Sequence, residues 1–144
     1  MKNSEIMRAW LEEAAGRLVE AREQQERGHY HRTVRLCQDS SEFALKALLM
    51  FCGVDVPDEH ALHQLVSRQP LVKQLSKDEQ RRLTRSSREL ADERLPSFYG
   101  SPDGTPPQRL YTQAQAEHAL EEADFVLATV RRLVGNAESP KEGA

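Results

Sequence analysis

The chain has 144 residues, of which 38% are hydrophobic and 30% charged, and its formal net charge is −3. This size suits one domain with a single core, and the composition excludes both a membrane protein and a wholly disordered chain. The small negative charge argues against a broad surface for duplex DNA. The longest apolar stretch, 44–54, is far shorter than the roughly 20 residues that span a bilayer, and no signal-peptide pattern is present. We therefore expect a cytoplasmic protein.

Two long amphipathic helices should open the chain. Apolar residues recur at steps of three and four over 4–27, and this pattern ends at Gly28. A second stripe begins at Tyr30 and ends at Gly53, where glycine suits the left-handed residue after a helix. A connection this short predicts an antiparallel hairpin. The first stripe consists of Ile6, Trp10, Ala14, Leu18 and Ala21.

A short helix and a third long helix should follow. After a loop at 54–59, the pattern indicates a short helix that ends before Pro70. Ser76 and Glu79 have the spacing of a capping box, in which each side chain binds a free backbone amide at a helix start. This predicts a helix over about 77–94. Its apolar stripe is thin, so much of it should face solvent or another chain.

The last third of the chain predicts a long loop and then a central helix. Four of the seven prolines lie in the segment 95–111, which favours a loop of unusual length. Thr112 and Gln115 form a second capping-box pattern, and the helix after them has the widest apolar face in the chain. Gly135-Asn136 should end this helix.

The expected fold is therefore all-α. We predict an up-and-down bundle of four long helices plus one short helix, because no segment alternates as a strand does. Residues 1–136 should form one helical domain, and residues 137–144 a flexible polar tail.

The remaining charged, aromatic, cysteine and histidine residues are expected to have structural roles. Glu42 and Lys46 have the spacing of a helical ion pair, and Trp10 suits the core or a dimer interface. Cys37 and Cys52 lie too far apart on one helix to form a disulfide and should pack as small apolar residues. The five histidines are scattered and predict no metal-ligand set with two carboxylates. We expect neither a metal nor another cofactor.

Several motifs together resemble a known family. The second helix carries the run from Ser41 to Leu49 and is followed by Pro57 and His60; Glu93-Arg94 runs into Phe98-Tyr99-Gly100; and Tyr111-Thr112 precedes the last helix. In order and spacing, these segments resemble the core of prokaryotic HEPN domains over nearly the whole chain. The resemblance implies a bundle of four or five helices that dimerises and is encoded beside a minimal nucleotidyltransferase, often as a toxin–antitoxin pair.

The resemblance also implies where a catalytic motif would lie. In many HEPN proteins, an arginine followed after four to six residues by a histidine cuts RNA without metal, and both protomers contribute to the site. Here Tyr99 stands where the histidine after Arg94 is expected. Tyrosine has an ordinary pKa of about 10, so roughly one in a thousand is ionised at pH 7 and Tyr99 would be a poor base. Another arginine-to-histidine spacing, from Arg22 to His29, lies outside the region that the family uses.

The sequence leaves three interpretations of function open. The first is a binding role, in which a HEPN homodimer associates with a minimal nucleotidyltransferase and holds a nucleotide or RNA phosphate near Arg88, Arg94 and Tyr99. Arginines are concentrated over 81–94, and guanidinium groups suit phosphate oxygens. The second is a metal-independent endoribonuclease toxin with Arg94 and Tyr99 as an atypical catalytic pair. The third is a helical protein without a nucleic-acid role.

Overall fold

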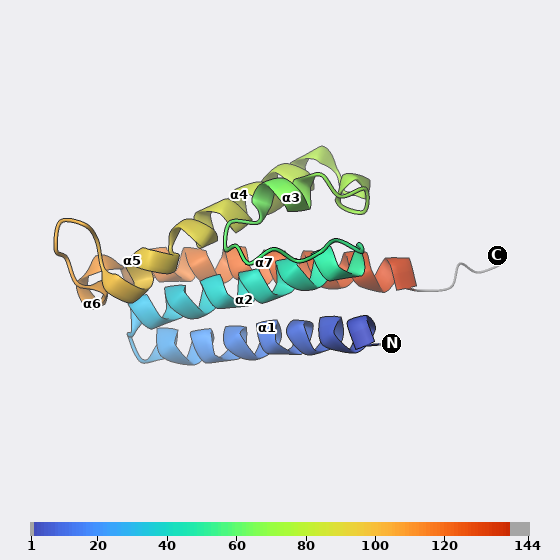
Figure 1. The fold of residues 1–144 in the computed structure, drawn as a ribbon. Coiled ribbons are helices and arrows are strands. Elements are labelled where there is room, and N and C mark those ends of the chain that lie inside the picture. Colours follow the sequence, from blue (N-terminus) through green and yellow to red (C-terminus); the bar gives the residue numbers. More distant parts are fainter. Residues whose placement is uncertain (1, 139–144) are drawn as a thin grey trace.

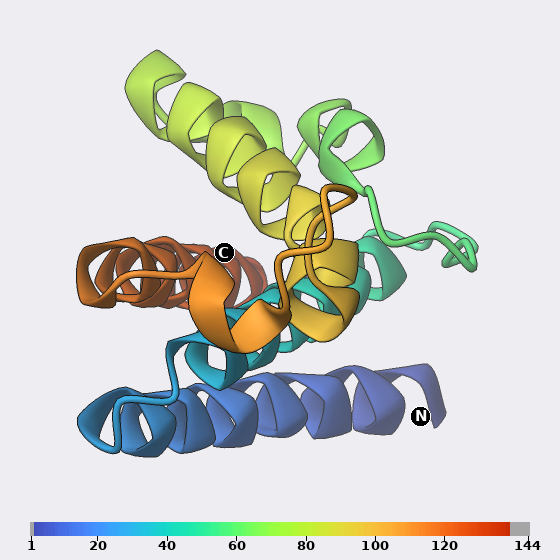
Figure 2. The same ribbon diagram turned by 90° about the vertical axis from the view of Figure 1, so that its left-hand side faces the viewer.

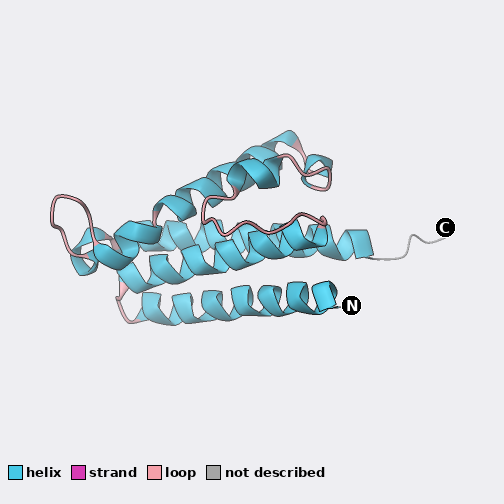
Figure 3. Cartoon of the chain, viewed as in Figure 1, coloured by secondary structure: helices cyan, strands magenta, loops and turns pink. Residues whose placement is uncertain are grey.

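The computed structural model describes residues 2–138, and this part of the chain consists of helices and loops without a strand (Figure 1, Figure 3). The predicted all-α fold is confirmed. None of the helices in these residues combines the length and apolar character that crossing a bilayer requires. In chain order the α-helices are α1 (Lys2–Glu26), α2 (Tyr30–Phe51), α3 (His63–Ser67), α4 (Lys77–Asp92), α5 (Arg94–Tyr99), α6 (Pro107–Leu110) and α7 (Gln113–Glu138), with a short 3-10 helix at Val72–Gln74.

The hydrophobic core lies where the four long helices meet. The predicted hairpin of α1 and α2 is present, α7 packs against both, and α4 packs against α2 and α7 from the other side (Figure 2). Burying one large apolar side chain stabilises the fold by about 1.5–3 kcal/mol, so these contacts dominate its stability. The buried side chains include Leu18, Leu48, Leu49, Leu83, Leu90, Val126 and Val130.

Both predicted capping boxes are present. At the start of α4, the Glu79 amide donates to the Ser76 hydroxyl at 3.1 Å, and the Ser76 amide donates to the Glu79 carboxylate at 3.3 Å. Before α7, the Gln115 amide donates to the Thr112 hydroxyl at 3.1 Å, and the Thr112 amide donates to the Gln115 side chain at 2.9 Å. These bonds satisfy backbone amides that have no partner inside the helix, which fixes where α4 and α7 begin.

The prediction of a long loop over 95–111 is wrong. Helix α4 ends at Asp92, and α5 follows almost at once, with Pro96 in its first turn. A proline is tolerated there because the backbone N–H that it lacks would have no partner in that turn. Helix α6 begins with a proline in the same way. The connecting loop is therefore confined to 100–106, and it places α5 at one end of the bundle (Figure 1).

Two smaller predictions also need correction. Helix α7 does not end at Gly135-Asn136 but continues to Glu138, since a glycine inside a helix costs only about 1 kcal/mol and does not break it. The predicted polar tail falls mostly at 139–144, outside the described residues. In α1, Met7 is buried, whereas Ile6 is 41% exposed, so the inner stripe is displaced by one residue at its start.

Candidate functional site

Helix α5 presents apolar side chains to solvent at the end of the bundle. Leu95, Phe98 and Tyr99 are 64%, 55% and 73% exposed. The Phe98 and Tyr99 rings are 4.6 Å apart between centroids, and the guanidinium carbon of Arg35 lies 4.8 Å from the Phe98 centroid. We call Leu95, Phe98 and Tyr99 the α5 patch. Exposed aromatic side chains beside a cation are typical of surfaces that bind another molecule.

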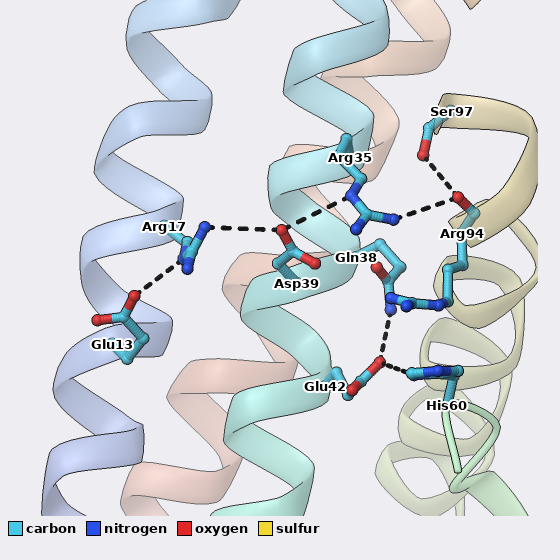
Figure 4. A network of polar contacts seen from close by, with 9 residues as sticks. All are labelled: Glu13, Arg17, Arg35, Gln38, Asp39, Glu42, His60, Arg94 and Ser97. Carbon is cyan, nitrogen blue, oxygen red and sulfur yellow. Dashed lines mark hydrogen bonds and ion pairs between the residues drawn. The ribbon is translucent and has the colours of Figure 1, made fainter. Parts of the chain in front are cut away.

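Arg94 lies at the start of α5 and faces α2. Arg35 on α2 donates to the Arg94 carbonyl oxygen at 3.3 Å, which ties the first turn of α5 to the bundle (Figure 4). Below it, Asp39 lies 3.8 Å from both Arg35 and Arg17. Burial raises the pKa of Asp39, and the nearby charges of Arg35, Arg17 and Arg94 offset part of this effect. The charge of Arg94 therefore acts on a polar cluster on α2 that includes Arg35 and Asp39.

The same face of α2 holds a histidine–carboxylate pair. His60, from the loop after α2, has its Nδ1 atom 2.8 Å from a Glu42 oxygen (Figure 4). Gln38 donates to the same oxygen at 2.9 Å, and Lys46 forms the predicted ion pair with Glu42 at 3.2 Å. Burial would raise the pKa of Glu42, but these hydrogen bonds and the Lys46 charge outweigh it, and the pKa is lowered. Glu42 is thus an anion that orients His60.

A groove of about 430 Å³ adjoins this pair. Its wall is formed by α1, α2 and the loop after α2, including Trp10, Asp39, Glu42, Phe43, Lys46 and Pro57. Trp10 was predicted to lie in the core or in a dimer interface, and it lies partly buried at the groove edge.

The structure separates the three predicted site residues. Arg88 is exposed on α4 and lines a different groove of about 430 Å³ with Arg81 and Arg85. Arg94 faces α2, whereas Tyr99, five residues later on α5, lines a third hollow with Pro96, Gly100 and Pro102. Within residues 2–138, no hydrogen bond or ion pair joins Arg88, Arg94 and Tyr99. A ligand that touches all three would have to span more than one hollow of this chain.

His60 is the residue that sequence reasoning missed near Arg94. It is 34 positions before Arg94 in the chain, and it approaches Arg94 only because both the loop after α2 and helix α5 cover the same face of α2 (Figure 4). The only signal in the sequence was the presence of His60 in the family-like segment. An imidazole held by a carboxylate, with a guanidinium nearby, can exchange a proton and neutralise a phosphate charge.

Two other candidates do not form sites. Arg22 pairs with Asp124, and His29 bonds the Gln24 side chain at 2.8 Å, so the alternative Arg22–His29 spacing brings no pair together. Burial raises the pKa of the Cys37 thiol, which leaves it protonated and unreactive.

Comparisons with known proteins agree with this architecture. The family model described as the HEPN domain matches residues 7–133. The crystal structure of TT1696 from Thermus thermophilus is similar, with a TM-score of 0.75 and 30% sequence identity over 88% of this chain and 97% of that one. The structure of ST0689, an archaeal HEPN homologue, has a TM-score of 0.70 and 24% identity over 89% and 97% of the two chains and shares the fold. None of the curated proteins that were compared matches the chain.

The chain belongs to the HEPN domain family. The match covers α2 and α4 completely and most of α1 and α7, and it includes both the α5 patch and the polar cluster of α2.

Proposed function

We propose that this protein is a HEPN homodimer that associates with a minimal nucleotidyltransferase in a toxin–antitoxin-like module and binds a nucleotide or RNA phosphate. The observation that carries the proposal is the α5 patch, since three large apolar side chains on one six-residue helix are left exposed beside Arg35 and Arg94. Covering these side chains with a second copy would release water from apolar surface, which favours association.

The pairing should be isologous, because a two-fold dimer uses the same surface on both copies. Helix α5 lies at the end of the bundle, so two copies that meet there would bring the Arg94 residues of both towards one shared region. That arrangement accounts for a phosphate site that one chain alone does not assemble, since Arg88, Arg94 and Tyr99 do not share one hollow here.

The first test is the mass of the particle. Light scattering of wild-type protein at micromolar concentration is expected to give about twice the chain mass of 16.4 kDa. Phe98→Asp places a charge within the patch and should give a monomer, with at least about a 100-fold weaker association constant. Val19→Asp is the matched control, because Val19 is 53% exposed, as Phe98 is at 55%, but lies on α1. Dimers in both variants, or a monomeric wild type, would contradict the α5 interface.

The second test is binding without cleavage. We expect the purified protein to bind RNA or a nucleotide and to leave RNA intact, and Arg94→Ala should weaken binding by about 10-fold or more. Arg131→Ala removes an exposed arginine of α7 and serves as the control. Fluorescence anisotropy at two salt concentrations measures both effects, because a phosphate contact weakens as salt rises. Equal binding by the two variants would rule out Arg94 as the contact.

Endoribonuclease activity is the second candidate, and the His60–Glu42 pair favours it. The imidazole of His60, oriented by the Glu42 carboxylate, is a more common proton carrier in catalysis than the phenol hydroxyl of Tyr99. An active nuclease would cut RNA in the presence of chelator and leave a 2′,3′-cyclic phosphate. His60→Ala and Arg94→Ala would abolish this cleavage, whereas Tyr99→Phe separates the two catalytic pairs because it removes only the hydroxyl. If RNA stays intact in all these reactions, the nuclease candidate is excluded and only the binding role remains.

The proposal of a nucleotidyltransferase partner depends on membership of the HEPN family. Co-expression with the product of a neighbouring nucleotidyltransferase gene should yield a stable complex on size exclusion, and its absence would remove this part of the proposal.

A further inference from the structure

A second cluster of ionisable side chains lies between α4 and α7, away from the α5 patch. Glu89 on α4 faces His118 and Glu122 on α7, which are four residues apart and therefore share one side of that helix. His118 Nε2 contacts a Glu122 oxygen and lies 3.6 Å from Glu89 Oε2. One ligand atom from each residue lies within 4.8 Å of the other two. The scattered positions of the five histidines along the chain gave no reason to predict a group of metal-ligand residues. The packing of α4 on α7 brings these three residues together.

Glu122 is the unusual member of this cluster. The residue is 6% exposed, and its Oε2 atom is buried without a hydrogen-bond partner. A buried carboxylate oxygen without a partner is costly, and a second carboxylate beside it adds repulsion. Either a proton or a cation between the carboxylates removes this cost. Arg85 is the nearby positive charge, and its side chain is exposed and forms no ion pair with either glutamate within the described residues.

The cluster also opens onto space. A groove of about 450 Å³ is lined by all three residues, with Leu90, Tyr111 and Ala119 on its apolar side. A bound ion would therefore keep at least one coordination position free for water or a small ligand, as ions held by three protein side chains commonly do.

We propose that Glu89, His118 and Glu122 bind a divalent transition-metal ion, for which Zn²⁺ is the probe. Imidazole nitrogen and carboxylate oxygen are both ordinary Zn²⁺ ligands, at about 2.0–2.2 Å. Donor atoms around a tetrahedral ion at that distance are about 3.4 Å apart. His118 and Glu89 are 3.6 Å apart, which is close to this separation. Glu122 contacts the same imidazole nitrogen of His118, so its carboxylate lies beside the other two donors. The imidazole disfavours Mg²⁺, which prefers oxygen ligands alone and keeps most of its water.

The test is calorimetric titration of tag-free protein that has been dialysed against chelator and then freed of it. Wild type is expected to bind one Zn²⁺ per chain, at least about 10-fold more tightly than Mg²⁺. His118→Ala and Glu122→Gln should each weaken Zn²⁺ binding by about 100-fold or more, since even residues behind the ligands change metal affinity 10- to 100-fold. His60→Ala is the matched control, because His60 contacts one glutamate but not two.

A second measurement distinguishes the loss of Zn²⁺ binding from the loss of the fold. Each variant is checked by circular dichroism, and Zn²⁺ should raise the melting temperature of wild type and His60→Ala but not of His118→Ala or Glu122→Gln. Absence of Zn²⁺ binding in wild type would overturn the proposal and leave a shared proton as the link between the two carboxylates. Binding that persists in both cluster variants, or that is lost in His60→Ala, would equally overturn it.

Discussion

Replacing Gly100 by alanine is expected to lower the free energy of unfolding by about 3 kcal/mol, with a melting temperature roughly 10 °C lower. Gly100 ends α5 with a φ of +91°, in the left-handed region that L side chains rarely adopt. A Cβ atom there would also collide with the carbonyl oxygen of Thr105 and lie 3.2 Å from the Pro106 Cα. Both obstacles are backbone atoms, so no side-chain rotation relieves them.

The collision has a further cost in hydrogen bonding. Thr105 O accepts from the Ser101 amide at 2.9 Å, and the Gly104 amide donates to Ser101 O at 3.0 Å, so the loop is closed on itself. Moving Thr105 away from a new Cβ breaks the first of these bonds. The α5 patch lies directly before this loop, and its orientation depends on the loop remaining closed.

Gly104→Ala is the matched control for this prediction. Gly104 has the same φ of +91°, but nothing lies within 4 Å of a Cβ built there. Gly104→Ala should therefore add only the cost of the backbone conformation, which lowers the free energy of unfolding by about 1 kcal/mol and the melting temperature by roughly 3 °C. Chemical denaturation of the three proteins at one concentration measures both changes. Equal losses in the two variants would show that the contact with Thr105 has no energetic effect.

Local signals explain which parts of the fold could be predicted from the sequence. The starts of α4 and α7 depend on residues three positions apart, Ser76 with Glu79 and Thr112 with Gln115, so the chain itself specifies them. Pro96 misled the prediction, because a proline that ends one helix is equally compatible with the first turn of the next. Only the packing of α5 against α2, through Arg35 and the Arg94 carbonyl, decides between these two outcomes.

The candidate sites depend on contacts that are distant in the sequence. Arg94 could be singled out from the family-like motif, but His60 reaches the same face of α2 from a loop whose path the sequence does not specify. His118 and Glu122 have readable helical spacing, whereas Glu89 joins them only because Leu90 and Leu83 direct one side of α4 into the core. The sequence thus indicated which residue types were available, and helix packing determined which of them meet.

Glu122→Gln is expected to remove a pH dependence of stability between about pH 5 and pH 8, measured in chelator so that no metal contributes. Burial, followed by the neighbouring Glu89 carboxyl group, raises the pKa of Glu122 to about 8, and Arg85 offsets part of this. Glu89, His118 and Arg85 are the ionisable groups that face it. The folded chain therefore keeps a proton that the unfolded chain has released above its ordinary pKa of 4.5.

The sign follows from proton linkage. Where the folded state binds more protons than the unfolded state, stability falls as pH rises, and it becomes constant above the folded pKa. Wild type should lose about 2 kcal/mol between pH 5 and pH 8, less than the full shift implies because the groove admits water. The pKa of Glu89 is lowered, so its opposite contribution is confined to pH values below about 4.5 and does not disturb this window.

Glu122→Gln should give a nearly flat profile of stability against pH, whereas Glu121→Gln, which changes an exposed neighbour on α7, should retain the wild-type slope. Urea denaturation at several pH values measures the three profiles, and parallel slopes in wild type and Glu122→Gln would mean that Glu122 is ionised in the folded chain.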